Sequence, residues 1–414
     1  MSSEWRNGNL GEFIELKRGY DLPQANRRSG SIPLVSSSGV SDCHDVAMVK
    51  GPGVVTGRYG TIGQVFFVEE DFWPLNTTLY VKDFKGNDPR FVHYFLKTVD
   101  FHAYSDKAAV PGVNRNHLHQ ALAAIPPLVF QKEIAASLGL LDDRITLLRE
   151  TNATLEAVAQ ALFKSWFVNF DPVRAKMEGR VPEGMDEAMA ALFPDSFEET
   201  ELGEVPKGWV SRTFRETISI IGGGTPKTSN PEFWGGNIPW FSVVDAPSPS
   251  DIFVVDTEKH ITEAGLSGSS TRLLPTGTTI ISARGTVGRL ALTGCPMAMN
   301  QSCYGLRGIA GDDYFTYLST TRLVNQLKQR AHGSVFDTIT QDTFAGVTLS
   351  YPTQEAIQAF DSSIEPMMLR IRENVLQSQT LSSLRDSLLP RLISGQLRLP
   401  DAELIAQEAI SCRH

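Results

Sequence analysis

The chain contains two copies of one series of motifs, and this repeat limits its possible folds more than any other feature. The glycine-rich stretch "GRYGTIG" at Gly57–Gly63 has a near-copy, "ARGTVGR", at Ala283–Arg289. Earlier in each copy, "SIPLVSSS" at Ser31–Ser38 corresponds to "NIPWFSVV" at Asn237–Val244. A repeat of this length predicts two domains with the same fold.

The remaining paired motifs keep the same order. They are "GYDLPQ" (Gly19–Gln24) with "GGTPK" (Gly223–Lys227), Asn76 with Asn300, and "VPGVNRNHL" (Val110–Leu118) with "VFDTITQDTF" (Val335–Phe344). The offset between copies grows by roughly 20 residues near "DAPSPSDIFVVDTEKH", which indicates an insertion in the second copy. Short alternating runs such as "QVFFV", "TLYVK" and "TTIIS" predict short strands joined by tight turns.

Each copy ends in a long helical pattern. Between Ile134 and Trp166, apolar residues alternate at spacings of four and three, which is an a/d heptad seam. The first helix, from Ile134 to Phe170, would be about 55 Å long at 1.5 Å per residue. The predicted seam consists of Leu141, Ile145, Leu148, Asn152, Leu155 and Leu162 in the first helix, and Ile364, Met368, Ile371, Leu384 and Leu388 in the second.

The simplest way to bury two such seams in one chain is for the two helices to pack on each other as an antiparallel pair. The alternative is that each helix packs on its own domain. Asn152 at a core position either fixes the register of the pair or faces solvent where the seam opens.

Composition and charge are those of an ordinary soluble globular protein, with 41% hydrophobic and 21% charged residues. The net charge of −9 does not by itself argue for nucleic-acid binding. The acidic excess lies largely in residues 131–200, with 7 Lys and Arg against 13 Asp and Glu, whereas residues 1–130 hold 13 of each. We therefore expect DNA binding to depend on help from a partner's charge.

The sequence gives no sign of export or membrane insertion. "MSSEWRNGNLGEF" lacks the basic and apolar regions of a signal peptide, and no apolar run is long enough for a membrane span. The cysteines, Cys43, Cys295, Cys303 and Cys412, form no CxxC pair. We expect a cytoplasmic protein without a disulfide framework.

Catalytic and metal sites are not supported by the motifs. "NIPW" (Asn237–Trp240) is close to the Asn-Pro-Pro-aromatic motif of amino-methyltransferases, but the first copy has "SIPL" at this point. "GGGTPK" lacks the Gly-Lys-Ser/Thr ending of a nucleotide P-loop. His117 and His119 have no third ligand nearby, and we predict no catalytic residue and no metal site.

A DNA-binding surface remains as the prediction. Arg and Thr side chains beside glycine turns are typical phosphate contacts, and Asn and Gln read adenine edges. Each glycine is equally explained by a turn that needs a positive φ. The predicted DNA-binding residues are Lys17, Arg18, Arg58, Tyr59, Thr61, Lys107, Asn114, Arg115, Lys227, Asn230, Arg284, Thr286, Arg289, Asn300, Gln301 and Arg330.

The chain resembles the DNA-specificity subunits of type I restriction-modification systems over nearly its whole length. The most specific stretches are "VNFDPVRAKMEGRVPEGM", "LFPDSFEETELGEVPKGW" and "LRDSLLPRLISGQL", together with the paired "IP…GT[IV]G…N…P" pattern. The resemblance implies an α+β fold in which two mixed α/β target-recognition domains with twisted sheets are joined by two long helices in an antiparallel coiled coil.

The expected division of the chain follows from the motifs and the resemblance. It comprises a first recognition domain (1–130), a first long spacer helix (131–172), a connector (173–208), a second recognition domain (209–352), a second long helix (353–396) and a tail (397–414).

The resemblance also implies the function and the partners. Each domain would read one half of a bipartite, asymmetric site in double-stranded DNA. The helices would set the spacer and dock two methyltransferase subunits, which carry S-adenosylmethionine. Restriction subunits, the motor-nucleases, would bring ATP and Mg. This chain would hold no cofactor and no catalytic centre. The alternatives are a stand-alone adenine methyltransferase built on Asn237–Trp240 and a coiled-coil scaffold without a DNA role.

Overall fold

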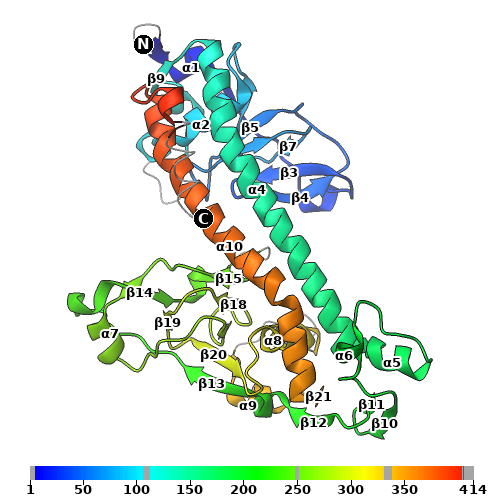
Figure 1. The fold of residues 1–414 in the computed structure, drawn as a ribbon. Helices are drawn as coiled ribbons and strands as arrows, with labels where there is room; N and C mark the ends of the chain where they lie inside the picture. Colours follow the sequence, from blue (N-terminus) through cyan, green and yellow to red (C-terminus); the bar gives the residue numbers. More distant parts are fainter. Residues whose placement is uncertain (1–4, 106–111, 248–250, 331–337, 403, 405–414) are drawn as a thin grey trace. The chain divides into compact units, whose positions relative to one another are not determined.

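The computed structural model describes residues 5–105, 112–247, 251–330, 338–402 and 404 (Figure 1). The chain divides into two compact units. Unit 1 comprises Met1–Ile145 and Gln379–His414, and unit 2 comprises Thr146–Ser378. Both boundaries fall within the long helices α4 (Leu128–Lys164) and α10 (Gln354–Ile393), so each unit contains part of both helices.

Unit 1 contains the first copy of the repeated domain, built on two sheets. The four-stranded sheet has the order β2-β8-β5-β6, and all its neighbours are antiparallel. In the three-stranded sheet β4-β3-β7, β3 pairs antiparallel with β4 and parallel with β7. The strands are β2 (Glu15–Arg18), β3 (Ile32–Ser36), β4 (Gly39–His44), β5 (Gly53–Gly57), β6 (Val65–Val68), β7 (Trp73–Pro74) and β8 (Thr78–Asp83).

Unit 2 repeats this topology in the second copy of the domain. Its larger sheet has the order β13-β20-β17-β18-β15, and its smaller sheet β16-β14-β19 again joins one antiparallel and one parallel neighbour to the central strand. The strands are β13 (Ile218–Gly222), β14 (Trp234–Phe241), β15 (Phe253–Val254), β16 (His260–Ile261), β17 (Thr279–Ser282), β18 (Leu290–Thr293), β19 (Ala298–Met299) and β20 (Cys303–Gly308). The predicted duplication is therefore confirmed, and the inserted segment supplies the extra edge strand β15.

Shorter elements complete the domains. In unit 1 these are β1 (Arg6–Asn9), α1 (Leu10–Phe13), α2 (Pro89–Lys97), α3 (Arg115–Leu118) and β9 (Leu122–Ile125). In unit 2 they are α5 (Asp171–Met177), α6 (Glu187–Ala190), β10 (Phe197–Thr200), β11 (Gly203–Pro206), β12 (Val210–Thr213), α7 (Glu263–Ser267), α8 (Tyr314–Arg330), α9 (Gln341–Ala345) and β21 (Thr348–Tyr351). The sheet β1-β9 corresponds to β12-β21, and both pairs are antiparallel.

The long helices pair antiparallel within each unit. In unit 2, Asn374 Nδ2 donates to Asn152 Oδ1 at 2.8 Å, and the Phe163 and Phe360 rings lie 5.9 Å apart. In unit 1, Arg385 contacts Asp142 at 2.5 Å. Later residues of α4 therefore meet earlier residues of α10. Both units therefore contain the antiparallel helix pair, and the alternative, in which each helix packs on its own domain, is wrong.

Most of the predicted seam is buried. Leu141, Ile145, Leu148, Asn152, Ile364, Met368, Ile371, Leu384 and Leu388 are at most 9% exposed. Leu155 and Leu162 are only partly buried, whereas Phe163 and Phe167 belong to the core. A straight α-helix drifts relative to a strict heptad repeat, and near the end of α4 Phe163 and Phe167 join the buried stripe, while the seam positions Ala159 and Trp166 remain buried.

The ends of the long helices differ slightly from the predicted boundaries. Helix α4 begins at Leu128, directly after two prolines, rather than at residue 131. It continues as the π-helical segment η4 (Ser165–Asn169), and Phe170 ends it with a left-handed φ of 59°. Helix α10 spans Gln354–Ile393 rather than 353–396. None of the helices in the described ranges is both long and apolar enough to cross a membrane.

Candidate nucleic-acid interface

The first glycine turn joins β5 to β6 and is tied to a distant segment. The backbone N–H groups of Arg58 and Tyr59 donate to the Thr77 carbonyl, and Val113 N–H donates to the Arg58 carbonyl at 3.0 Å. The Arg58 guanidinium lies 4.5 Å from the centroid of the Tyr59 ring, which is 37% exposed. Arg58 and Thr61 are partly buried.

The second glycine turn joins β17 to β18 and has the same design. Gly285 and Gly288 take left-handed φ values of 77° and 78°, close to the 76° and 82° of Gly60 and Gly63. Ile339 N–H donates to the Ala283 carbonyl at 2.9 Å. Both turns are thus closed by a segment that follows much later in the same copy.

These contacts change which residues correspond. The bridge between Tyr59 and Gly112 matches the bridge between Arg284 and Thr338. Arg284 therefore occupies the position of Tyr59, and Arg58 corresponds to Ala283. Arg284 is exposed, as is Thr286 beside it. The two copies thus offer an aromatic ring with a stacked guanidinium at one turn and an exposed guanidinium at the other.

Arg289, by contrast, is engaged within the protein. Its Nη2 lies 2.9 Å from the Pro247 carbonyl oxygen and 3.4 Å from that of Ala246. Its N–H donates to Ser282 Oγ at 2.8 Å, and Ser282 Oγ donates to the Thr286 carbonyl at 2.6 Å. Arg289 therefore holds the shape of the turn.

A second pair of equivalent segments meets at the end of each small sheet. In unit 1, Asn76 Nδ2 donates to Asp21, which also forms an ion pair of 3.2 Å with Arg18. In unit 2, Thr225 Oγ1 donates to Gln301 Oε1. The structure thus brings the predicted residue Arg18 together with Asn76, and it brings the exposed Gln301 next to the segment that carries Lys227.

Lys17 lies beside a pair of tyrosines. Its Nζ donates to the Tyr20 hydroxyl at 3.2 Å, and the Tyr20 and Tyr80 hydroxyls are 2.9 Å apart. The hydrogen bond with Tyr80 lowers the pKa of Tyr20, whereas burial raises the pKa of Tyr80. Lys17 is held at this site and is partly buried.

Three of the predicted asparagines have structural roles. Asn114 Oδ1 caps α3 by accepting from Asn116 N–H at 2.9 Å. Asn230 and Asn300 accept from the N–H groups of Glu232 and Ser302 in the same way. A bidentate contact to adenine needs both the amide oxygen and the amide nitrogen. These hydrogen bonds fix the orientation of the three amide groups and use one acceptor site of each Oδ1.

The other predicted residues are a mixed set. Arg115 and Lys227 are exposed. Lys107 lies outside the described residues, and Arg330 is the last residue of α8, with a side chain that the structure does not describe. Sequence reasoning missed Asn374, the partner of Asn152, although both follow an Arg-Glu pair in the seam, in "RETN" and "REN".

The methyltransferase alternative fails at its aromatic residue. Trp240 is 7% exposed, its ring contacts Trp234 edge-on at 5.1 Å, and its Nε1 donates to the Gly224 carbonyl at 3.0 Å. A base-stacking aromatic must present its ring face to a pocket. Trp240 is instead a core residue of the small sheet.

Metal binding finds no support in the described part of the chain, where no three His, Cys, Asp or Glu side chains form a cluster. His119 Nε2 accepts from the Leu16 N–H at 3.0 Å, so this histidine completes the backbone hydrogen bonds of β2.

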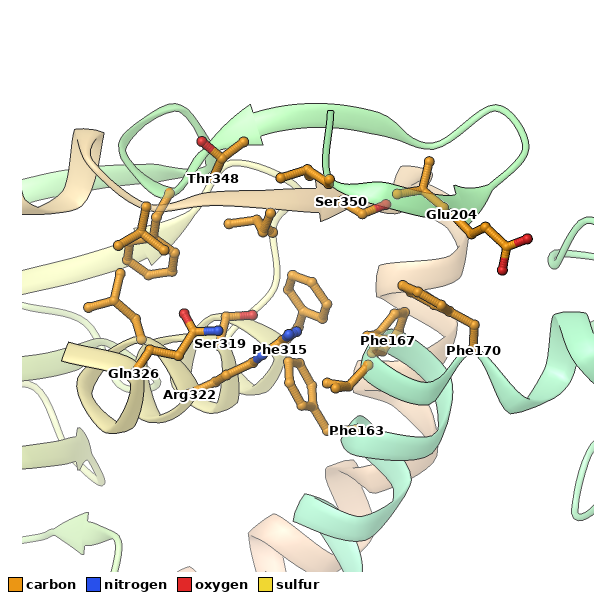
Figure 2. Close-up of a pocket in the computed structure, with 17 residues that line it drawn as sticks. Phe163, Phe167, Phe170, Glu204, Phe315, Ser319, Arg322, Gln326, Thr348 and Ser350 are labelled. Atoms are coloured by element: carbon orange, nitrogen blue, oxygen red, sulfur yellow. The ribbon is translucent and has the colours of Figure 1, made fainter. Parts of the chain in front are cut away.

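A cavity of about 300 Å³ in unit 2 lies apart from these residues (Figure 2). Its floor is α8, with Ser319, Arg322 and Gln326, and Thr348 and Ser350 of β21 lie opposite. Phe163, Phe167, Phe170 and Phe315 supply the aromatic wall. Burial lowers the pKa of Arg322. Among the described residues that line this cavity, none belongs to the predicted DNA-binding set.

Comparisons with known proteins identify the family. The family model described as the type I restriction modification DNA specificity domain matches residues 2–157 and 206–364. The specificity subunit of the type I restriction enzyme HindI from Haemophilus influenzae is 28% identical over 391 residues, which cover 81% of this chain and 84% of that protein.

Two further similarities agree with this match. The MjaIX specificity subunit from Methanocaldococcus jannaschii is 33% identical over 168 residues, 39% of this chain and 38% of that protein. The crystal structure of a type I restriction-modification S subunit from M. genitalium covers 94% of this chain and 96% of its own, with a TM-score of 0.53 and 15% identity, and so shares the fold. The chain therefore belongs to the type I restriction-modification DNA-specificity family, as a specificity subunit that recognises DNA rather than a catalytic subunit.

Proposed function

We propose that each recognition domain reads one half of a bipartite, asymmetric site in double-stranded DNA. One observation carries this proposal: the same strand order occurs twice, with different side chains at the exposed glycine turns. Tyr59 stands at one turn and Arg284 at the other. Two domains with one scaffold and different contact residues suit two different half-sequences.

The contacts divide by chemistry. Arg284, Thr286, Arg115 and Lys227 are exposed and suit phosphate oxygens, which position a protein on DNA without reading sequence. Tyr59 and Gln301 are exposed side chains that suit base edges or ribose. Arg58, Thr61 and Lys17 are partly buried; Arg58 stacks on the Tyr59 ring, and Lys17 donates to the Tyr20 hydroxyl.

The long helices, in this proposal, set the spacer between the half-sites and dock two methyltransferase subunits. On α4, Leu140 of unit 1 is 71% exposed, and Leu147 of unit 2 is 51% exposed. Each exposed leucine suits an apolar contact with a partner subunit. The partners would carry the cofactors, S-adenosylmethionine on the methyltransferase subunits and ATP with Mg on the restriction subunits.

Footprinting of the complex with its methyltransferase subunits tests the proposal. We expect two protected segments separated by a spacer of fixed length. Protection of a single segment, or of none, would contradict the two-domain reading and would favour a scaffold role. Incubation of the chain alone with S-adenosylmethionine and genomic DNA should give no methyl transfer. Transfer in this control would restore the methyltransferase alternative.

A further inference from the structure

The N-terminus of α8 is capped by a residue of a different element. Three consecutive backbone N–H groups donate to the Asp361 carboxylate of α10. Asp313 and Tyr314 donate to Oδ2 at 2.7 and 3.1 Å, and Phe315 donates to Oδ1 at 2.7 Å. A helix N-terminus leaves such N–H groups without partners inside the helix, and its dipole favours a negative charge there. Asp361 thus binds the second recognition domain directly to the spacer helix.

A neighbouring side chain adds to this contact. Gln358 Nε2 donates to the Ala310 carbonyl at 3.0 Å. Gln358 and Asp361 are three residues apart, so they lie on the same face of α10. One turn of the spacer helix therefore holds residues 310–315 of the domain through a donor and an acceptor. We call this contact the Asp361 cap.

The apolar packing at this junction fixes orientation less strictly than the cap does. The Phe315 ring meets Phe163 and Phe167 edge-on or tilted, at 5.6 and 5.0 Å. Burial of apolar surface is non-directional, whereas hydrogen bonds weaken steeply when their angles change. Because both oxygens of Asp361 are engaged, rotation of the domain about α10 would break the cap before it opened the apolar contact.

The first domain is held by the same plan with different chemistry. Helix α2 is capped by its own Asp88, whose Oδ1 accepts from Phe91 N–H at 2.9 Å. Gln131 of α4 then accepts from Asp88 N–H at 2.9 Å and donates to Asn87 Oδ1 at 2.8 Å. In each copy, a polar side chain of the long helix that follows the domain forms hydrogen bonds at the N-terminus of a helix inside the domain, α2 in the first copy and α8 in the second.

We propose that Asp361 is a positioning residue for spacer length: it fixes the rotation of the second recognition domain about α10 and thereby the DNA spacing that the complex accepts. This rests on the proposed function, in which the two domains read two half-sites. Adjacent spacer lengths differ by one base pair, which is about 34° of rotation and about 3.4 Å of rise. Without the hydrogen bonds to Asp361, the domain can rotate about α10 and can therefore accept DNA whose spacer is one base pair longer or shorter.

The test uses complexes of the full chain with its methyltransferase subunits. Wild-type and Asp361→Ala complexes methylate a series of DNA duplexes with both half-sites and spacers that differ by one base pair. The wild-type complex should prefer one spacer. In Asp361→Ala, the preference over the adjacent lengths should fall roughly tenfold, which corresponds to about 1.4 kcal/mol. Both half-sequences should stay the same, because Asp361 faces the protein.

Two further variants make the result interpretable. Glu373→Ala removes an exposed carboxylate of α10 that pairs only with Arg370 at 3.6 Å among the described residues, and its spacer preference should equal that of wild type. Asp361→Asn keeps the side-chain volume and should also broaden the spacer preference. It replaces Asp361→Ala in the test if thermal unfolding shows that Asp361→Ala does not fold.

A folded Asp361 variant with the wild-type spacer preference would overturn the proposal, and so would a changed half-sequence. If the wild-type complex methylates no two-part site, the proposed function itself is wrong, and the spacer proposal is overturned with it.

Discussion

At the scale of single residues, the two glycine turns carry different residues at equivalent positions, and the shared GT[IV]G motif does not reveal this difference. Both turns carry an arginine shortly before GT[IV]G, and the sequence presents Arg58 and Arg284 as a pair, although Arg58 lies two residues before Gly60 and Arg284 directly before Gly285. The bridges in the structure pair Arg284 with Tyr59 instead. Aligning Gly60 with Gly285 gives the same pairing of Tyr59 with Arg284, because the glycines occupy equivalent positions in the two turns and the arginines do not.

Arg284 should contribute one phosphate contact. Removing it in Arg284→Ala should weaken DNA binding by the methyltransferase complex and reduce the salt slope of log K by about 1. Tyr59→Arg, which gives the first turn the residue of the second, should raise the slope by a similar amount. Binding titrations at several salt concentrations measure both effects.

Arg180→Ala is the matched control, because Arg180 is exposed and pairs with Glu178 within the connector. Its slope should stay at the wild-type value. An unchanged slope in Arg284→Ala would remove this residue from the DNA contacts.

The asparagine pair in the helix seam carries a second prediction at this scale. Asn152 and Asn374 are each 1% exposed and hydrogen-bond to each other. Asn152→Leu or Asn374→Leu alone leaves one buried amide without a partner and should destabilise the protein by about 1–3 kcal/mol. The double variant should recover most of this loss, since replacing both polar partners with apolar groups is nearly neutral.

Urea unfolding followed by far-UV circular dichroism compares the four proteins. Thr154→Leu, on the exposed face of the same helix, is the control and should stay close to wild type. Single variants as stable as wild type would show that the pair makes no net contribution.

At the scale of elements, the helices were the most predictable part and their domain contacts the least. The heptad spacing located the seam because a packed helix must bury one face. The drift that places Phe163 and Phe167 in the core was not predicted, because it depends on where the helices stop pairing and the domain begins. Strand order could not be predicted either, because the residues of such short strands do not indicate which strands pair with each other.

Contacts between the helices and the domains depend on ionisation. Tyr94 of α2 donates to Asp142 of α4 at 2.6 Å, and Arg385 of α10 reaches the other carboxylate oxygen. Burial acts to raise the pKa of Asp142, but the hydrogen bonds from Tyr94 and Arg385 outweigh it, and the net pKa is lowered. A carboxyl with a lowered folded-state pKa stabilises the fold above its unfolded-state pKa, and this contribution is lost as the pH falls through the folded value.

Tyr94→Phe should therefore destabilise the protein by about 1.5–3 kcal/mol at pH 7, the usual range for a hydrogen bond to a charged group. The difference from wild type should shrink once the pH falls below the ordinary aspartate pKa and through the lowered pKa of Asp142, because the protonated carboxyl no longer gains from the Tyr94 hydrogen bond. Thermal unfolding between pH 3 and 8 measures the difference. An effect of equal size at all pH values would show that the lost hydroxyl acts independently of the Asp142 charge.

At the scale of the whole molecule, the duplication was the part of the account that sequence alone supported best. Equivalent motifs in the same order predicted equivalent domains, and the two sheets of each copy have matching strand orders. The candidate site was predicted only in outline. Arg284 and Tyr59 are exposed at their turns, but the hydrogen bonds that Asn114, Asn230 and Asn300 accept from nearby N–H groups depend on local backbone geometry that residue type does not specify.

Helix length should set the spacer. Inserting one heptad into both α4 and α10 keeps the a/d seam in phase and adds about 10.5 Å. At about 3.4 Å per base pair, the spacer of the methylated site should grow by about three base pairs, with both half-sequences retained. Insertion into α4 alone breaks the pairing and should abolish methylation. An unchanged spacer in the double insertion would mean that the helices do not measure the distance.

Replacing residues 1–130 with the first domain of a different specificity subunit should change one half of the recognised sequence and leave the other half unchanged. Methylation motifs of the hybrid complex give the answer directly. A change in both halves would mean that the domains do not read DNA independently.

The most direct test of the central claim is single-molecule sequencing of DNA methylation in the native strain with and without this chain. Two duplicated domains that read different half-sites predict one adenine methylation motif made of two unlike parts around a spacer of fixed length, and this motif should disappear when the chain is deleted. A methylation pattern that the deletion leaves unchanged, or the loss of a motif with only one continuous part, would show that the two domains do not read two half-sites.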